Sequence, residues 1–331
     1  MQPPPSPPKN TTFTLATSRQ RTLAWTLNAT SWAGPLTLAQ YLTRETTLSC
    51  TALSSCSGPS PYGTPYYVLH LASDPDEILS ACEVTVKRAL VLRTKVKSGG
   101  KRARGLAGYL LRCVQREVDG VLGCEFGVLY SDIGREYYTG LGWMDGRNAQ
   151  VVFTLEQGLE AGEAEGVVML GEGDVKEFCE RDEARQRERL EKGGYRRGGD
   201  AGWHFARDRY VSGAMRDGRE VVNRGTRTNN RGSWLYWDHD LREKKLKIYG
   251  SQIAESGTGR ETQDWDLPSV TVWIPAVEVC VAAMELWQEI GEKLKVVFEE
   301  RQHGSIPSLR WKDGKDSSRI IWEDNEYFAW C

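Results

Sequence analysis

One short stretch decides the fold, Arg102-Ala103-Arg104-Gly105-Leu106-Ala107, which stands between a predicted strand and a predicted helix. A glycine at such a turn lets the backbone approach a ligand closely, and the small Ala107 keeps the first helical turn uncrowded. The free N–H groups of that turn and the positive end of the helix dipole form a site for a pyrophosphate. Lys101, Arg102 and Arg104 would add positive charge for the phosphates. The stretch is therefore a candidate nucleotide-phosphate site.

This stretch has three interpretations other than a phosphate site. A Walker-type nucleotide loop is excluded, because Gly100-Lys101 is followed by Arg102 where that loop requires Ser or Thr. An ordinary basic helix start fits the hexapeptide as well as a phosphate site does. A nucleic-acid-binding loop would depend on Lys95 to Arg104 alone, and the nearly neutral chain disfavours it.

The composition is that of a folded protein with more than one domain. The chain has 331 residues, of which 40% are hydrophobic and 27% charged, and this length suggests a pair of domains. Its 43 Lys and Arg against 45 Asp and Glu leave a net charge of −2, which argues against a large nucleic-acid surface. No run approaches the roughly 18 apolar residues of a transmembrane helix, so no membrane span is predicted.

The cysteines and histidines predict neither a disulfide framework nor a metal site. The eight cysteines include no Cys-x-x-Cys pair, and none of the four histidines lies beside a cysteine at zinc-ligand spacing. Buried free thiols are the favoured interpretation, which places the protein in a reducing compartment, the cytoplasm.

Strand and helix patterns alternate over the first part of the chain, which predicts an α+β (α/β-like) fold. Strands are expected at 13–15, 66–71, 78 to about 96, 126–129 and 151–155. Helices are expected at 18–28, 37–48, 105–118 and 133–139.

The expected organisation is a short leader and two folded domains joined by a linker. Residues 1–10 are a disordered leader, 11–155 the N-terminal domain, 156–200 a charged linker with a solvated helix, and 201–331 a second α+β domain. The second domain contains nine of the 12 tryptophans, and such large aromatics need an interior to bury them. Strands at 234–237 and 246–249 are expected to pair there.

A second pattern, Tyr137-Tyr138-Thr139-Gly140-Leu141-Gly142-Trp143, follows the candidate phosphate helix. Its aromatic–Tyr–x–x–x–Gly–aromatic order resembles the GCN5-related N-acetyltransferase superfamily, whose fold has a mixed β-sheet with helices on both faces. In that superfamily the tyrosine near this position often protonates the departing thiolate of coenzyme A. The resemblance implies that role for Tyr138. The alternative is that both tyrosines are core aromatics, which is the expectation for Tyr137.

Further blocks, in matching order, are similar to a narrower group, the fungal lysine N6-acetyltransferase family. They cover nearly the whole chain outside the leader and the linker, which is more specific than any single motif. The blocks are Ser31 to Leu36, Tyr41 to Glu45, Ser80 to Glu83, Lys87 to Val91, Val128 to Gly134, Trp203-His204, Arg207, Ser305 to Trp311 and Asn325 to Cys331.

The resemblance implies transfer of an acetyl group from acetyl-CoA to the side-chain amine of free lysine, a reaction of lysine degradation. That amine is an ammonium at neutral pH, with a pKa of about 10.4, so a base must take its proton first. Glu83, in a strand otherwise built of apolar and β-branched residues, is the candidate base, and an outward-facing edge carboxylate is the equal alternative. Backbone N–H groups would stabilise the oxyanion, and Tyr138 would act as general acid.

The acceptor side is expected to use Trp32, in the turn that ends at Pro35, and Arg44, which could clamp a carboxylate. The Arg44-Glu45 sequence is more often a surface pair, and that alternative is favoured. The implied partner is a small-molecule amine, with no nucleic acid, membrane or metal, and the sequence does not predict an oligomeric state.

The segment before the phosphate stretch is shorter than in the family. Relatives carry an additional strand there, whereas only Arg93 to Lys101 remain here. Either Cys82 to Val96 takes over as the strand that leads into the phosphate stretch, or the site is incomplete. The alternative to an active enzyme is therefore an impaired or inactive member that serves as a coenzyme A-binding or protein-interaction scaffold.

Overall fold

The computed structural model describes most of the N-terminal half of the chain and separate segments of the rest. Described are residues 7–50, 63–86, 89–91, 106–155, 167–169, 201–205, 214–216, 219–221, 224–228, 234–240, 243–252, 267–273, 294–312 and 320–322, and positions 177, 180, 181, 184, 187, 188, 280, 281, 283–285 and 288. The chain divides into two compact units. The first comprises residues 1–146, 195–206 and 303–321, and the second 147–194, 207–302 and 322–331.

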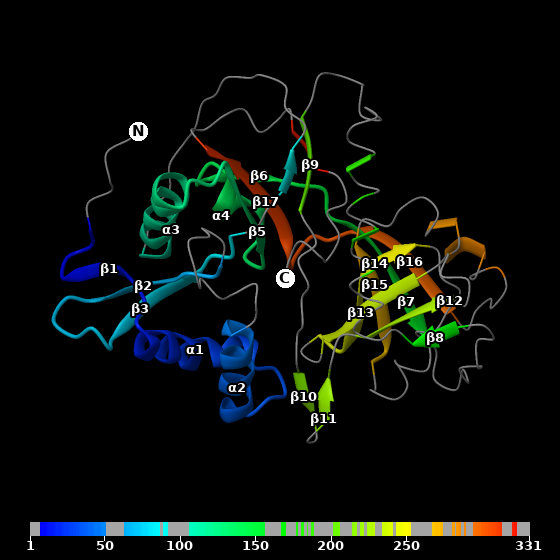
Figure 1. Cartoon of the computed structure of the whole chain (residues 1–331), viewed down its shortest axis with the longest axis horizontal. Coiled ribbons are helices and arrows are strands. Elements are labelled where there is room, and N and C mark those ends of the chain that lie inside the picture. Colours follow the sequence, from blue (N-terminus) through cyan, green and yellow to red (C-terminus); the bar gives the residue numbers. More distant parts are fainter. Residues whose placement is uncertain are drawn as a thin grey trace. The chain divides into compact units, whose positions relative to one another are not determined.

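The helices and strands are labelled in Figure 1. The helices are α1 (Ser18–Trp32), α2 (Leu38–Ser49), α3 (Leu106–Arg116), the π-helical turn η1 (Glu117–Val121) and α4 (Arg135–Thr139). The strands are β1 (Thr11–Leu15), β2 (Tyr66–Leu71), β3 (Ile78–Glu83), β4 (Ala89–Val91), β5 (Phe126–Ser131), β6 (Met144–Asp145), β7 (Ala149–Leu155), β8 (Val167–Met169), β9 (Ala201–Phe205), β10 (Ala214–Arg216), β11 (Arg219–Val221), β12 (Arg224–Thr228), β13 (Trp234–Asp240), β14 (Lys245–Gln252), β15 (Ser269–Trp273), β16 (Leu294–Glu300), β17 (Ile306–Trp311) and β18 (Ile320–Trp322).

The helix α1 begins at a capping box. The Thr17 hydroxyl accepts a hydrogen bond from the backbone N–H of Gln20 (3.2 Å), and Gln20 Oε1 accepts one from the Thr17 N–H (3.1 Å). This reciprocal pair satisfies N–H groups that a helix start otherwise leaves free. The N-cap is therefore Thr17, and α1 begins at Ser18, where the sequence predicts a helix start.

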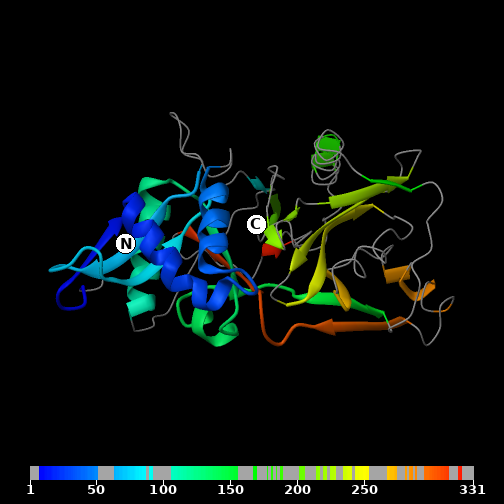
Figure 2. The ribbon, with the colours of Figure 1, turned by 90° about the horizontal axis from the view of Figure 1, so that it is seen from below.

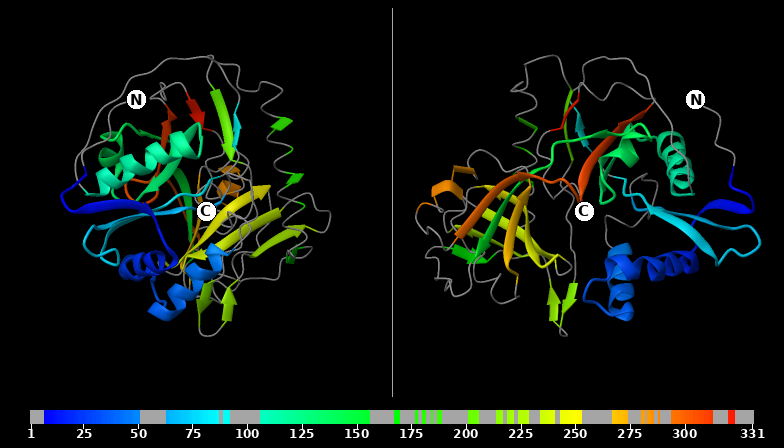
Figure 3. Two further views of the ribbon diagram at one scale, coloured as in Figure 1. Left: turned by 60° about the vertical axis from the view of Figure 1, so that its left-hand side comes forward. Right: turned by 180° about the vertical axis from the view of Figure 1, so that it is seen from behind.

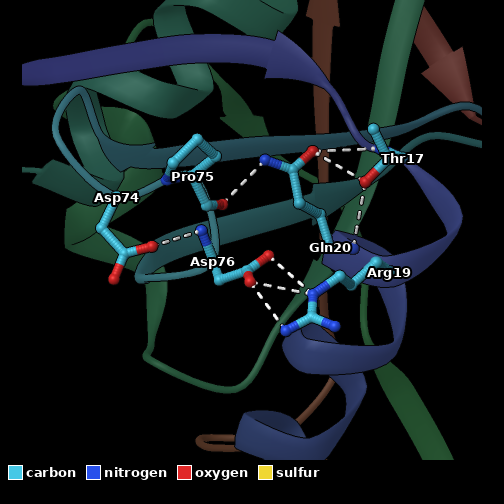
Figure 4. A network of polar contacts seen from close by, with 6 residues as sticks. All are labelled: Thr17, Arg19, Gln20, Asp74, Pro75 and Asp76. Atoms are coloured by element: carbon cyan, nitrogen blue, oxygen red, sulfur yellow. Dashed lines mark hydrogen bonds and ion pairs between the residues drawn. The ribbon is translucent and has the colours of Figure 1, made fainter.

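The same helical turn is tied to the connection between β2 and β3 (Figure 4). Gln20 Nε2 donates to the carbonyl oxygen of Pro75 at 2.9 Å. Arg19 pairs with Asp76, but its side chain remains 75% exposed, so this ion pair contributes little stability. The buried Gln20 is the stronger anchor for α1.

Helices cover both faces of the β1-β2-β3 sheet, as the resemblance to the N-acetyltransferase superfamily implies. Figures 1 and 3 show α1 and α3 on opposite sides of the β2–β3 hairpin. The core under α1 and α2 consists of Ala24, Trp25, Tyr41, Tyr66, Val68 and Ile78. The core under α3 consists of Tyr67, Leu69, Leu110, Val114 and Val118. Successive strand residues point to opposite faces, so neighbouring tyrosines of β2 lie in different cores.

A strand from late in the sequence completes the first unit. β17 lies antiparallel to β5, with Ile306 opposite Ser131 and Trp311 opposite Phe126, and its other edge pairs with β6. Arg310 of β17 also makes two hydrogen bonds to the Asp119 carboxylate of η1, at 2.9 and 2.6 Å.

The second unit contains a seven-stranded sheet in the order β16-β7-β15-β14-β13-β12-β8. Its strands are antiparallel neighbours except β14 and β15, which run parallel. Figure 2 shows β16 beside β7 in this sheet. The core on it consists of Val151, Trp237, Leu246, Ile248, Leu267, Val270 and Val272. The expected pairing of the strands at 234–237 and 246–249 is confirmed by β13 and β14.

The expected strand from 78 to about 96 is wrong in its extent. β3 ends at Glu83, and Val86 then makes an isolated bridge with Gly63. β4 leaves this hairpin and pairs antiparallel with β9, a strand more than a hundred residues later in the sequence. A partner so distant in sequence is not visible in a local hydrophobic pattern.

The compact units do not coincide with the expected domain ranges. Residues 151–155 were expected in the N-terminal layer, but β7 pairs with β15 and β16 in the second unit. Residues 306–311 were expected in the C-terminal domain, but β17 pairs with β5 in the first unit. Within the described residues, no helix is long and apolar enough to cross a membrane.

Candidate active site

The helix α3 begins at Leu106, where the sequence predicts the end of the phosphate stretch. Leu106 and Ala107 are both exposed at this helix start. Arg102, Ala103, Arg104 and Gly105 lie outside the described residues.

Gly108, which follows Ala107 in α3, is buried and faces the Tyr137 hydroxyl. A Cβ at Gly108 would lie 3.6 Å from that hydroxyl oxygen. The Tyr137 hydroxyl therefore reaches the first turn of α3.

Tyr138 lies in the short helix α4 and is half-buried. Its ring makes edge-to-face contacts with Tyr137, at 5.1 Å between centroids, and with Trp143, at 6.2 Å. The backbone N–H of Trp143 donates to the Tyr138 carbonyl oxygen at 3.0 Å, which closes the turn after α4. Burial raises the pKa of the Tyr138 hydroxyl, and nearby Tyr137, Cys82 and Asp132 raise it further. The phenol is therefore protonated at neutral pH and can donate a proton.

Tyr138 approaches the end of β3 from the side that α3 covers. Cys82 is paired in register with Tyr67, and both pack with the core under α3. Burial raises the pKa of the Cys82 thiol to about 12, with a further contribution from the neighbouring Glu83. The thiol is consequently neutral, and it is within electrostatic reach of Tyr138.

Glu83 is the last residue of β3 and faces the opposite side. It is paired in register with Tyr66, which belongs to the core under α1 and α2. The Glu83 residue keeps access to solvent, but dense protein surroundings reduce the hydration of its carboxyl group. This loss of hydration raises the pKa of Glu83 to about 7, the charge of Glu45 adds to the rise, and Arg21 opposes it.

The helix α2 contributes Tyr41, Arg44 and Glu45 to the surroundings of Glu83. Arg44 Nη2 and Nε donate to Glu45 Oε1 at 2.7 and 3.1 Å. The guanidinium carbon of Arg44 lies 4.8 Å from the centroid of the Tyr41 ring, and Tyr41 is only 3% exposed. Burial, with the charge of Glu45 next, raises the pKa of Tyr41 to about 12. The Arg44 guanidinium therefore binds residues of its own helix, as the alternative of an Arg44–Glu45 pair describes.

The helix α1 contributes Arg21, Trp25 and Asn28. The guanidinium carbon of Arg21 lies 5.0 Å from the centroid of the Trp25 ring, which in turn meets Tyr66 edge to face at 6.3 Å. Asn28 donates from Nδ2 to the Tyr66 hydroxyl at 3.3 Å. Burial, followed by the charge of Glu83, raises the pKa of Tyr66. Tyr66 is therefore a neutral phenol held between α1 and the end of β3.

The structure brings some predicted site residues together and separates others. Arg44 and Glu83 lie in one group, on the side of β3 that α1 and α2 cover. Tyr138 lies toward the same end of β3 but on the opposite face, where it is within electrostatic reach of Cys82. Trp32 is the last residue of α1 and is 38% exposed, and its role in binding an acceptor stays a prediction.

Three residues of this group were not predicted as site residues: Arg21, Glu45 and Tyr66. Glu45 was visible in the sequence only as the neighbour of Arg44, and no local pattern singled out Arg21. Their proximity to Glu83 results from the packing of α1 and α2 on the hairpin. Among the described residues, no group of three or more His, Cys, Asp or Glu side chains is placed to hold a metal ion.

Comparison with known proteins gives one family match. Residues 154–331, more than half of the chain, match the family model of the LYC1 GNAT-like C-terminal domain. No curated protein is similar enough in sequence to match the chain.

The solved structures that are similar to the chain have low sequence identity to it. The GCN5-related N-acetyltransferase from Kribbella flavida is 14% identical with a TM-score of 0.45, and the match covers 91% of this chain and 71% of that one. The GCN5-related N-acetyltransferase from Anabaena variabilis is 10% identical with a TM-score of 0.44, over 91% of this chain and 72% of that one. At these scores the family assignment depends on the sequence match alone.

Proposed function

Because the chain belongs to the family of the LYC1 GNAT-like C-terminal domain, which is of the GCN5-related N-acetyltransferase type, we propose that it transfers an acetyl group from acetyl-CoA to the side-chain amine of free lysine. The reaction would belong to lysine degradation and take place in the cytoplasm. These finer assignments follow from the blocks of sequence that resemble the fungal lysine N6-acetyltransferase family.

One observation supports the proposal most strongly, the state of Glu83. Glu83 is the last residue of its strand and is exposed to solvent, and the pKa of its carboxyl group is raised to about 7. A general base works best when its pKa is near the operating pH, because it is then ionised and still accepts a proton strongly. An acceptor ammonium with a pKa of about 10.4 has to lose a proton before it attacks a thioester. Glu83 is suited to remove that proton, directly or through a water molecule.

Tyr138 would supply the proton that the departing thiolate of coenzyme A needs. Its raised pKa keeps the phenol protonated, and it approaches the end of β3 from the other face of the hairpin. The acid and the base therefore reach one end of one strand from two sides.

The first turn of α3 suits a pyrophosphate. Leu106 and Ala107 are exposed there, at the end of the helix where backbone N–H groups are free to bind an anion. The residues that would hold the phosphates are those from Arg102 to Ala107. Acetyl-CoA, as co-substrate, would supply the activated acetyl group.

A specific observation favours the second candidate function, a family member that binds coenzyme A or a protein without catalysis. Among the described residues, β3 pairs with β2, β4 pairs with β9, and β5 pairs with β17. The described sheet therefore has no strand beside β3 on the side away from β2. In the family that this chain resembles, such a strand leads into the phosphate stretch and holds the pantetheine arm.

Two measurements on the full chain distinguish the candidates. Calorimetric titration with acetyl-CoA tests binding, and an assay of free thiol with lysine as acceptor tests transfer. The proposal predicts binding and lysine-dependent release of thiol that is lost in Glu83→Gln. Arg19→Gln, a change to an exposed residue of the ion pair with Asp76, is the control and should behave as the unchanged chain does. Binding without release would support the scaffold function, and the absence of both would reject both candidates.

A further inference from the structure

Arg21 is a cation of the Glu83 group whose guanidinium contacts the Trp25 ring but makes no ion pair or hydrogen bond with the described residues. It is half-buried on α1, and its Nε is buried without a hydrogen-bond partner. None of the residues that the structure describes forms an ion pair or hydrogen bond with its terminal nitrogens, so this end of the guanidinium is free to bind a ligand. The guanidinium lies over the Trp25 ring in a cation–π contact, with 5.0 Å between the guanidinium carbon and the ring centroid.

We propose that Arg21 binds the carboxylate of the acceptor, so that the site selects amines that carry a carboxylate at their other end. This inference rests on the proposed function and names the substrate class of the same site. A guanidinium offers two parallel N–H groups that match a carboxylate, and a guanidinium already held by an aromatic ring loses less freedom on binding.

Arg44, the cation that the sequence suggests for this role, is occupied. Two of its nitrogens donate to Glu45 Oε1, and the Tyr41 ring covers one face of its guanidinium. An acceptor carboxylate would have to compete with the Glu45 carboxylate, whose side chain is only 14% exposed. Arg21 has no such competitor among the described side chains.

The position of Arg21 relative to Glu83 also determines which amine reacts. The contacts run from Arg21 to Trp25, from Trp25 to Tyr66, and from Tyr66 across the strand pair to Glu83. Arg21 and Glu83 are within electrostatic reach but are not an ion pair. With its carboxylate at Arg21, an acceptor is expected to bring its distal amine to Glu83, rather than the α-amine on the adjoining carbon.

Charged groups from several elements face Glu83, and their effects on its pKa determine the pH at which the variants should be compared. Arg21 of α1 lowers the pKa of Glu83, Glu45 of α2 raises it, and Arg44 is paired with Glu45. Tyr66 of β2 and Cys82 of β3 are neutral. Loss of Arg21 would therefore raise the pKa of the base, and rates should be compared at a pH well above 7, where Glu83 is ionised in both proteins.

The test compares lysine with pentane-1,5-diamine, which is lysine without its carboxylate. With Arg21→Gln we expect kcat/KM for lysine to fall at least tenfold, mainly through KM, and kcat/KM for the diamine to change less than twofold. Arg21→Lys keeps the charge without the planar pair of donors and should give a smaller loss, again with lysine only. Arg19→Gln, on the same helix, should change neither value. Equal losses with both acceptors, or an unchanged value with lysine, would overturn the inference.

A failure of the proposed function would be recognised separately. If the unchanged protein releases no thiol with either acceptor, the acetyl transfer itself is rejected. Calorimetric binding of lysine and of the diamine then decides the role of Arg21. Tighter binding of lysine that is lost in Arg21→Gln supports the inference, and equal binding of the two amines contradicts it.

Discussion

Because the pKa of Glu83 is raised, the rate of acetyl transfer should depend on pH near neutrality. With a pKa of about 7, the ionised fraction of Glu83 falls from about nine-tenths at pH 8 to about one-tenth at pH 6. Because only the carboxylate can accept a proton, kcat/KM for lysine should fall about tenfold over this range. A glutamate at its ordinary pKa of about 4.3 would be ionised throughout, and the rate would hardly change.

The substitution Glu45→Gln tests whether the charge of Glu45 contributes to the raised pKa of Glu83. Glu45 raises the pKa of Glu83 through its charge, so its removal should lower that pKa. Arg44, released from Glu45, would remain as a nearby cation and act in the same direction. We therefore expect the fall in kcat/KM between pH 8 and pH 6 to be smaller in Glu45→Gln than in the unchanged protein.

The assay is the initial rate of thiol release at saturating acetyl-CoA, measured across this pH range. Glu83→Gln should reduce the rate by about 10²- to 10⁴-fold, the usual contribution of a general base, and should abolish the acidic limb. Arg19→Gln serves as the control. An acidic limb that stays in place in Glu45→Gln, or persists in Glu83→Gln, would refute the reasoning.

Three further predictions concern the rest of the first unit. Tyr138→Phe should lower turnover at least tenfold and leave acetyl-CoA affinity nearly intact, which steady-state rates and calorimetry would show, and an unchanged rate would reject Tyr138 as the acid. Asp119→Asn should destabilise the fold by about 2 kcal/mol in urea unfolding, because it removes charge-assisted bonds to the 12%-exposed Arg310, whereas Asp76→Asn at the exposed pair should cost about 0.5 kcal/mol or less. Equal costs would contradict the role given to β17. Gly108→Ala should stabilise α3 by about 0.5–1 kcal/mol, since its Cβ would make ordinary contact at 3.6 Å, and a lower melting temperature would show a clash instead.

Local elements could be predicted well from the sequence. The strand at 66–71 is confirmed by β2, and the helices expected at 18–28 and 37–48 are confirmed by α1 and α2, although both extend further. Thr17 and Thr37, with glutamines three residues later, form capping boxes that mark these starts. Short-range signals of this kind depend on residues close in sequence, which is why they are readable.

Long-range pairing could not be predicted in the same way. β4 pairs with β9, and β17 returns to pair with β5, although large parts of the chain separate the partners. The residues of the candidate site were likewise predictable only where the signal was local in the sequence. Glu83 could be selected because a carboxylate is unusual in an apolar strand, whereas Arg21 acquires its significance only when α1 packs beside Tyr66. Arg44 had the right chemistry for a carboxylate clamp, but Glu45 already binds its guanidinium.

The identity of the acetylated product tests the central claim most directly. The full chain should be incubated with acetyl-CoA and free lysine, and the product identified by nuclear magnetic resonance. The account predicts lysine acetylated on its side-chain amine, formed by the unchanged protein and not by Glu83→Gln. Acetylation of the α-amine, or a product that forms equally without the Glu83 carboxylate, would contradict it.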